Sequence, residues 1–475
     1  MPHDLPRAQT RLKFISPKFN PLIFYFTQWV LPILLRFRLR PWLPTGIAKI
    51  EVTGAELLAS LYQKFQKGDI RFLMAFRHPE VDDPLCMMHL FSKAVPKAAK
   101  KLGIILNLPT HSHFLYDRGM TIWAGDWLGW FFSSLGGLPI HRGKRLDKVG
   151  LKTARDLFAN GILPMTVAPE GATNGHSDRL SPLEPGVAQL GFWCVEDLQK
   201  ANRLEEVLIV PIGIQYNYIN PDWKKIDWLL SKLEADCGLF YSAVSIEGLE
   251  KQHNENPSSY LYERLFQLGE HVLSVMENFY SRFYHQPFNN KPLEELTDKN
   301  QALALRIQAL LDSSLQAAEQ FFGLESQGTI IERCRRLEGA SWDDIYRTDL
   351  PDIKNLSPIE RGLADWIAEE AGLRVLHMRL VESFVAVTGS YVKEKPSFER
   401  FSETTLILFD LIARIKGEKS PKRPRLGWRQ ANLTVGNPIS VTERWENYQA
   451  SRQAAREEIN KLTDELQTSL QKMIV

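Results

Sequence analysis

The spacing of hydrophobic and polar positions changes along the chain and divides it into regions. Between about residues 49 and 245, short apolar runs alternate with stretches in which apolar residues recur at helical spacing. The runs of strand length are Ile70–Phe76, Gly103–Leu108, Leu163–Val167 and Val207–Ile214. Alternation of this kind is typical of an α/β fold with a mostly parallel sheet and flanking helices. We therefore expect one α/β domain over residues 49–250.

From about residue 254 to residue 416, strand-like runs nearly vanish and helical spacing takes over. One apolar stripe there runs through Ile359, Leu363, Ile367 and Ala371, and it is opened by the segment Ser357–Glu360. That opening combines an N-cap serine, a proline in the first turn and a glutamate at the third helical position. We predict an inserted all-α module whose apolar stripes pack in its core.

A basic, proline-containing linker at Gly417–Gly427 ends this module. A strand-like run at Ala431–Val441 and an amphipathic helix at about 442–473 follow it. The expected plan therefore has four parts, which are a membrane-associating segment (1–48), the α/β domain (49–250), the helical insertion with its linker (251–427), and a closing strand and helix (428–475).

The N-terminal segment differs from the rest of the chain in charge. Residues 1–50 contain eight basic side chains and a single acid, Asp4, and an uncharged aromatic run lies between Lys18 and Arg36. A bilayer crossing needs about 20 apolar residues, and two prolines with Thr27 and Gln28 interrupt this run. Aromatic side chains flanked by arginines are typical of the membrane interface. We expect an interfacial helix, and a buried helix and a true span remain the alternatives.

The amino-acid composition argues against some classes of function but does not identify the function. The 475 residues are 44% hydrophobic and 24% charged, which is the balance of an ordinary globular protein. The net charge of +2 argues against nucleic acid as the main partner. The four cysteines are far apart in the sequence and form no metal-ligand pattern, so we expect reduced thiols, a cytosolic setting and no metal cofactor.

The segment FRHPEVDDP, residues 76–84, carries the first candidate chemistry, because it directly follows a buried apolar run. If a strand ends near Arg77 and a helix begins near Asp83, the carboxylate of Asp83 can accept a hydrogen bond from one ring nitrogen of His78. The other nitrogen is then available as a general base. No GxSxG segment lies nearby to supply a nucleophile, so the substrate itself can provide the attacking hydroxyl. A helix cap is the alternative for Asp83.

Three later segments add to this hypothesis. GLPIHRGKR ends in a basic cluster that contains Arg142, which suits phosphate. APEG places Glu170 and Gly171 directly after a strand-like run, where a glycine lets the backbone approach a ligand. VLIVPIGI carries Pro211, which suits a strand end or an edge strand near a cleft. Taken singly, each segment also fits a plain turn or an edge strand.

In this order, the four segments His-x4-Asp, Gly-x-Pro-Ile-x-Arg, Pro-Glu-Gly and Val-Pro-Ile resemble the blocks of the glycerolipid acyltransferase family, which includes the lysophosphatidic acid acyltransferases. The resemblance covers roughly residues 49–240 and 430–475. It implies His78 as general base and Asp83 as its orienting partner. It implies Arg142, Glu170 and Gly171 as acceptor-binding residues, and Pro211 as a residue that shapes the substrate channel.

The sequence also departs from the family pattern. Ala172, Thr173 and Asn174 follow Pro-Glu-Gly where the family usually has Thr-Arg-Ser, so one phosphate-binding arginine is missing, and Arg179 or the cluster at Arg142–Arg145 can replace it. Arg77 and Glu80 stand where an asparagine and a serine are common. The long helical insertion is not usual in the small members of the family. These differences bear on the acceptor's headgroup more than on the reaction.

The resemblance implies an O-acyltransferase at the cytoplasmic face of a membrane, peripheral or monotopic. Its donor would be acyl-CoA or acyl-carrier protein, its acceptor a lysophospholipid such as 1-acylglycerol 3-phosphate or another alcohol, and its attachment site an anionic lipid surface. Two other classes stay open. One is a non-catalytic lipid-binding or scaffold protein on the same fold. The other is a metal-dependent hydrolase with His78, Asp82, Asp83, His111 and His113 as ligands.

Overall fold

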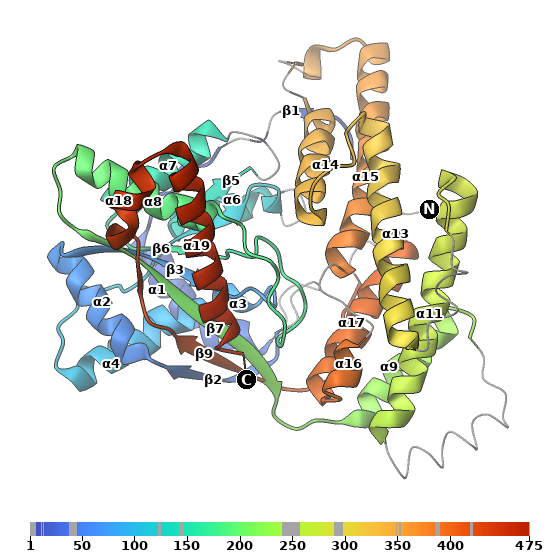
Figure 1. Ribbon diagram of the computed structural model, residues 1–475, viewed down its shortest axis with the longest axis horizontal. Helices are drawn as coiled ribbons and strands as arrows, with labels where there is room; N and C mark the ends of the chain where they lie inside the picture. Colours follow the sequence, from blue (N-terminus) through green and yellow to red (C-terminus); the bar gives the residue numbers. More distant parts are fainter. Residues whose placement is uncertain are drawn as a thin grey trace. The chain divides into compact units, whose positions relative to one another are not determined.

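Two units make up the chain in the computed structural model, which describes residues 6–10, 12, 14–37, 45–121, 125–141, 147–239, 257–288, 298–347, 349–350, 353–384, 390–418 and 421–474 (Figure 1). The α/β unit comprises Lys13–Ile219 and Trp428–Val475, and the helical unit comprises Met1–Leu12 and Asn220–Gly427. The helical insertion thus begins at Asn220, ahead of the expected boundary after residue 250. The α/β unit resumes at Trp428, where the closing segment was expected.

The α/β unit is built on one sheet in the order β2 (Ile47–Thr53), β9 (Arg429–Val435), β7 (Glu206–Tyr218), β3 (Ile70–Phe76), β6 (Met165–Val167), β4 (His113–Asp117) and β5 (Gly137–Ile140). The last five strands in this order run parallel to one another. Strand β9 runs antiparallel to β7, and β2 pairs in parallel with β9. The sheet is therefore mostly parallel, and the closing segment adds an inner strand to it.

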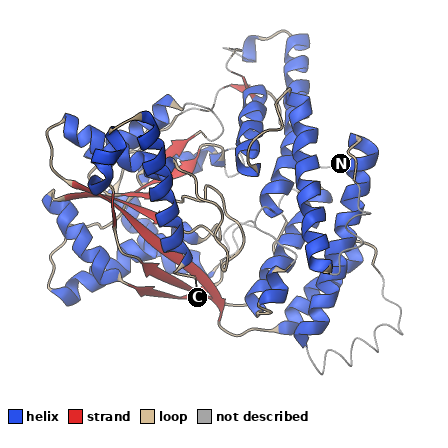
Figure 2. Ribbon diagram, in the orientation of Figure 1, coloured by secondary structure: helices blue, strands red, loops and turns tan. Residues whose placement is uncertain are grey.

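Helices cover both faces of the sheet (Figure 2). One face packs against α1 (Pro21–Arg36), α2 (Ala55–Lys67), α3 (Asp83–His89), η1 (Leu90–Ala94) and α4 (Val95–Leu102). The other packs against α7 (Lys148–Asn160), α8 (Gly186–Lys200) and α19 (Arg452–Gln471). On β3, Phe72 and Met74 face the first layer, while Leu73 and Ala75 face the second. Because both faces of a parallel strand such as β3 are buried, most of its residues are apolar and they follow one another without polar alternation.

The strand predictions had mixed outcomes. Strand β3 begins and ends at Ile70 and Phe76, as predicted. The strand predicted at Gly103–Leu108 is wrong, because this segment lies outside the sheet and Ile105 is 89% exposed. The strand that follows β3 along the chain and joins the sheet is β4 instead. The position expected for Pro211, at a strand end or on an edge strand, is also wrong, since Pro211 lies inside β7 and β7 has neighbours on both sides.

The helical unit contains α9 (Trp223–Asp236), α11 (Pro257–Tyr284), α13 (Lys299–Phe322), α14 (Ile330–Ile345), α15 (Pro358–Phe384), α16 (Tyr391–Glu394) and α17 (Phe398–Ile415). A short parallel pair, β1 (Gln9–Thr10) with β8 (Tyr346–Arg347), also belongs to it. The predicted start of α15 is confirmed, because Glu360 accepts a hydrogen bond from the backbone N–H of Ser357 at 2.9 Å.

The core stripe predicted for α15 is mostly wrong. Ile359 is 73% exposed, and Leu363 and Ile367 are also exposed. The buried face of this helix is made by Ala364, Ala368 and Ala371. Small side chains allow close approach to neighbouring helices, so the face with the smaller residues turns inward.

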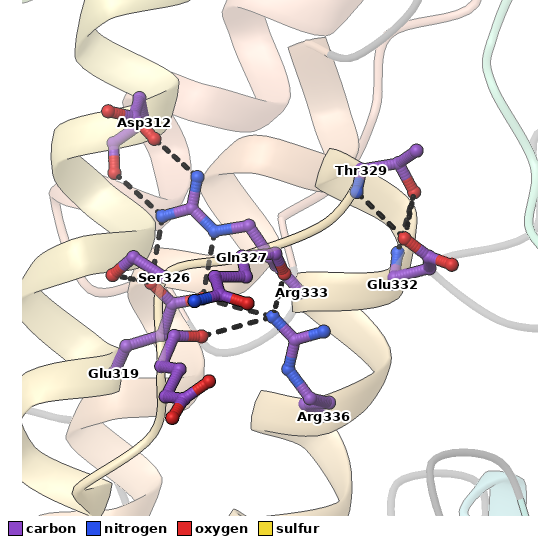
Figure 3. Close-up of polar contacts among 9 residues, drawn as sticks. Asp312, Glu319, Ser326, Gln327, Thr329, Glu332, Arg333 and Arg336 are labelled. Atoms are coloured by element: carbon purple, nitrogen blue, oxygen red, sulfur yellow. Dashed lines mark hydrogen bonds and ion pairs between the residues drawn. The ribbon is translucent and has the colours of Figure 1, made fainter.

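The connection between α13 and α14 is fixed by charged groups (Figure 3). The buried Arg333 side chain donates to both carboxylate oxygens of Glu319 at 2.8 Å and also binds Asp312. Thr329 and Glu332 form a capping box at the start of α14. A bidentate, buried arginine–carboxylate pair of this kind restricts the geometry of the turn.

Candidate active site

His78 lies in the short turn between the end of β3 and the start of α3. Its Nδ1 is 2.9 Å from Oδ2 of Asp83, so the two side chains meet across the turn. Asp83 is fully buried, whereas the His78 side chain is 19% exposed. No residue that the structure describes forms a hydrogen bond with Nε2 of His78. One ring nitrogen is therefore fixed by the protein, and the other is open to a ligand.

Asp83 is held by two further donors. Its Oδ2 also accepts the backbone N–H of Glu80 at 2.9 Å, and its Oδ1 accepts the Tyr216 hydroxyl at 2.5 Å. Burial raises the pKa of Asp83, and the hydrogen bonds from His78 and Tyr216 oppose this rise. An ionised Asp83 only accepts hydrogen bonds, so the proton of a neutral His78 ring belongs on Nδ1. Nε2 then carries the lone pair that a general base needs.

The other two acids of the segment point to a different partner. Oδ2 of Asp82 is 2.7 Å from Nη2 of Arg429, and Glu80 lies 3.4 Å from Nη1 of the same guanidinium. Burial raises the pKa of Asp82 to about 6, and the Arg429 charge opposes this rise. Arg429 also stacks over the Tyr216 ring at 4.8 Å from its centroid. The first residue of β9 thus supports the turn that carries His78.

Glu170 joins the site from the loop after β6, which is the neighbour of β3 in the sheet. Its Oε1 accepts the backbone N–H of His78 at 2.7 Å. Its Oε2 accepts from the Asn174 amide at 3.0 Å and from the Ser181 backbone N–H at 2.9 Å. Burial raises the pKa of Glu170, and the hydrogen bond from the His78 backbone opposes this rise. Glu170 therefore positions the His78 backbone, and its acceptor-binding role stays a prediction.

Gly171 has a φ of +73°, in the left-handed region that favours glycine. Its N–H donates to the carbonyl of Ala168 at 3.1 Å, which closes a tight turn directly after β6. Nearby, the N–H of Gly175 donates to the carbonyl of Pro79 at 3.0 Å. The loop after β6 is therefore attached to the His78 turn through backbone as well as side-chain bonds.

Arg77 is a supporting residue that the sequence reasoning did not assign. Its side chain is fully buried. It donates to the carbonyls of Ser177 at 2.6 Å, Arg179 at 2.7 Å, and His176 and Ile214 at 3.3 Å. A buried guanidinium needs several acceptors, so an arginine directly after a buried strand was a signal for such a network. Its charge also acts to lower the pKa of Glu170.

The remaining predicted site residues lie elsewhere or are not described. Arg142 lies outside the residues that the structure describes. Pro211 is buried within β7 opposite Ala75, where the antiparallel neighbour of β7 changes from β10 (Ile439–Ser440) to β9. Its carbonyl accepts the N–H of Gly436 at 2.9 Å. A proline has no N–H to lose at such a break, and its proposed channel role stays a prediction.

The histidines proposed as further metal ligands are used in other ways. Nε2 of His111 lies 2.9 Å from the Leu135 carbonyl, and Nδ1 of His113 lies 3.0 Å from the Gly136 carbonyl. Burial lowers the pKa of His111 to about 4. Within the described ranges, no group of three or more histidine, cysteine, aspartate or glutamate side chains is arranged to hold a metal ion.

Comparisons with models of protein families, with curated proteins and with solved structures found no match. The case for a function therefore depends on the geometry around His78 and on the sequence motifs.

Proposed function

We propose that the α/β unit is an O-acyltransferase that moves an acyl group from a thioester to a hydroxyl acceptor, with a 1-acylglycerol 3-phosphate as the acceptor class. The observation that carries the proposal is the His78–Asp83 pair. A fully buried carboxylate fixes Nδ1 at 2.9 Å, and the partly exposed ring leaves Nε2 open. This is the base-and-orienter arrangement of a catalytic triad with the nucleophile left to the substrate.

The chemistry needs one proton transfer and one bond exchange. Nε2 of His78 accepts the acceptor's hydroxyl proton while its oxygen attacks the thioester carbonyl carbon. The carbon–sulfur bond then breaks, and the thiol leaves with the proton from the imidazolium. Asp83 stabilises the imidazolium while it exists, because the carboxylate already binds Nδ1–H.

A cysteine nucleophile is a weaker explanation of this site. Cys86 is the cysteine nearest to the pair along the chain, and its Sγ lies 3.4 Å from the Tyr216 hydroxyl. It is fully buried, and burial raises the pKa of its thiol. A thiol with a raised pKa forms little thiolate at neutral pH, and thiolate is the reactive form. Transfer without a covalent enzyme intermediate therefore fits these residues better.

The surface of α1 supports attachment to a lipid surface. Leu22, Phe26, Trp29 and Ile33 follow one another at spacings of four, three and four residues, and all are exposed. The opposite face of the helix, including Phe24, is buried in the unit. A continuous exposed apolar stripe on one side of a helix suits the boundary between headgroups and acyl chains.

A second helix of the α/β unit also has exposed apolar side chains. Trp127 and Trp130 on α6 (Asp126–Ser134) are exposed. The end of α6 is bonded to the segment before α1, because the N–H of Lys18 donates to the Ser133 carbonyl at 2.9 Å. Among the described residues, no helix is both long enough and apolar enough to cross a bilayer. We propose peripheral attachment through α1 and α6 at the cytoplasmic face.

The test is an acyl-transfer assay on the purified full chain with lysophosphatidate, glycerol 3-phosphate and neutral alcohols, each with acyl-CoA and with acyl-carrier protein. General acid–base catalysis contributes roughly 10²–10⁴-fold, so His78→Ala and Asp83→Asn should each lose activity within that range. His89→Ala is the matched control, because His89 is another partly buried histidine nearby on α3.

Two outcomes would contradict the proposal. Full activity in a folded His78→Ala variant would remove the general-base role. A wild-type chain that transfers nothing to any acceptor, yet sediments with vesicles, would favour the non-catalytic lipid-binding protein.

A further inference from the structure

The helical unit contains a partly open cavity of about 100 Å³ that the proposed reaction does not use. Its walls come mainly from α11, α13 and α17, and they include Leu265, Met276, Leu311, Ile407 and Leu411. Among the described residues that line it, none is charged. Apolar cavities of this kind stay dry and take up apolar ligands.

Gly269 forms part of the cavity wall in the middle of the long helix α11. Glycine is unfavourable in a helix interior, and its usual justifications are a positive φ or a close backbone neighbour. Neither applies here, because Gly269 is not among the glycines with positive φ and a Cβ added to it would meet no heavy atom within 4 Å. The absence of a side chain at Gly269 therefore leaves open space in the cavity wall.

The polar groups around the cavity favour an uncharged ligand. The Tyr262 hydroxyl donates to Asn300 and the Tyr391 hydroxyl donates to Glu403, each at 2.6 Å. Ser314 donates to the carbonyl one turn before it at 2.8 Å. These three donors are already engaged, whereas the buried hydroxyl of Thr404, another lining residue, has no hydrogen-bond partner among the described residues. The described lining contains no cation. One hydroxyl does not replace the hydration of a carboxylate or phosphate group, so a charged headgroup is disfavoured in the cavity.

We propose that this cavity binds the terminal part of a fatty-acyl chain while the chain's headgroup stays outside. One water needs roughly 10–15 Å³ of the same kind of volume, and a methylene group is about as large as a water. The cavity of about 100 Å³ therefore accommodates roughly seven to ten carbons. The inference does not rest on the proposed function, because every lining residue belongs to the helical unit.

The experiment is photolabelling of the full chain with two probes that carry a diazirine near the methyl end. One probe is a free long-chain fatty acid, and the other is a lysophosphatidylcholine, so the two arms distinguish the sources of the chain. Labelled peptides are then mapped by mass spectrometry. Gly269→Leu places a side chain in the cavity. Gly362→Leu is the matched control, because Gly362 is a glycine in the second turn of α15 with equally open surroundings.

We expect labels on α11, α13 or α17 in wild type and in Gly362→Leu, and at least a tenfold loss of these labels in Gly269→Leu. Labelling by the fatty acid alone identifies a free fatty acid as the source of the chain. Labelling by both probes shows that the cavity accepts the acyl chain from either source. No label on these helices in wild type, or equal labelling in Gly269→Leu, would overturn the inference. If Gly269→Leu melts below wild type, Gly269→Ala replaces it and must still weaken labelling.

Discussion

Replacing Tyr216 by phenylalanine removes a single hydroxyl from the support of Asp83. That hydroxyl donates to a fully buried carboxylate at 2.5 Å, and the ring is itself buried beside Arg429. Phenylalanine keeps the packing and the ring contact with the guanidinium. A hydrogen bond to a charged group contributes about 1.5–3 kcal/mol, whereas a neutral one contributes about 0.5–1.5 kcal/mol. We expect Tyr216→Phe to destabilise the α/β unit by an amount in the higher range.

Tyr62→Phe is the matched control. Tyr62 is also buried, and its hydroxyl donates to the neutral carbonyl of His111 at 2.9 Å. Because the acceptor is uncharged, this variant should lose an amount in the lower range, with no dependence on pH. The free energy is best measured by hydrogen exchange of the slowest amides in β3 and β7, since a chain of two units need not unfold in one step.

The pH dependence gives the sharper test. Burial raises the folded-state pKa of Asp83 above its unfolded value, so the folded chain holds this proton more tightly and loses stability as pH rises through the folded-state pKa. The hydrogen bond from the Tyr216 hydroxyl favours the charged carboxylate, so this pKa rises further when the hydroxyl is removed. The loss in Tyr216→Phe should therefore grow with pH. A loss equal to that of Tyr62→Phe at every pH would refute the reasoning.

Three further predictions concern the salt bridge of Asp82, the position of the His78 turn and the exposed face of α1. Arg429→Met should destabilise the α/β unit by about 3–5 kcal/mol in hydrogen exchange, because it leaves Asp82 buried without its cation at 2.7 Å; adding Asp82→Asn should recover part of this loss, and no recovery would contradict the pairing. Glu170→Gln should lower acyl transfer through a displaced His78 turn, since the N–H groups of His78 and Ser181 each donate to a different oxygen of Glu170, and glutamine has only one acceptor oxygen; unchanged kcat would contradict this positioning role. Trp29→Ser should reduce sedimentation with anionic vesicles, while Trp366→Ser, at a similarly exposed tryptophan of the helical unit, should not; equal effects would place the lipid contact elsewhere.

Local sequence signals predicted the features that depend on neighbours a few residues away. Strand β3 is predictable from a short apolar run, and the start of α15 is predictable from its capping residues. Both signals lie within a few consecutive positions of the sequence. The meeting of His78 and Asp83 is also local, since a turn from strand to helix brings residues five apart together. The segment Gly103–Leu108 has the apolar composition of a strand, but it does not pair with any strand of the sheet.

Only the tertiary structure decided which residues support the candidate base. Tyr216 and Arg429 reach the His78 turn from β7 and β9, which are far along the chain from it. Arg77 binds carbonyls that lie about a hundred residues away or more. On α15, the sequence offered an apolar stripe, and packing turned the alanine face inward instead. Periodicity fixes the type of element, but burial depends on which distant surfaces meet, and no local pattern contains that information.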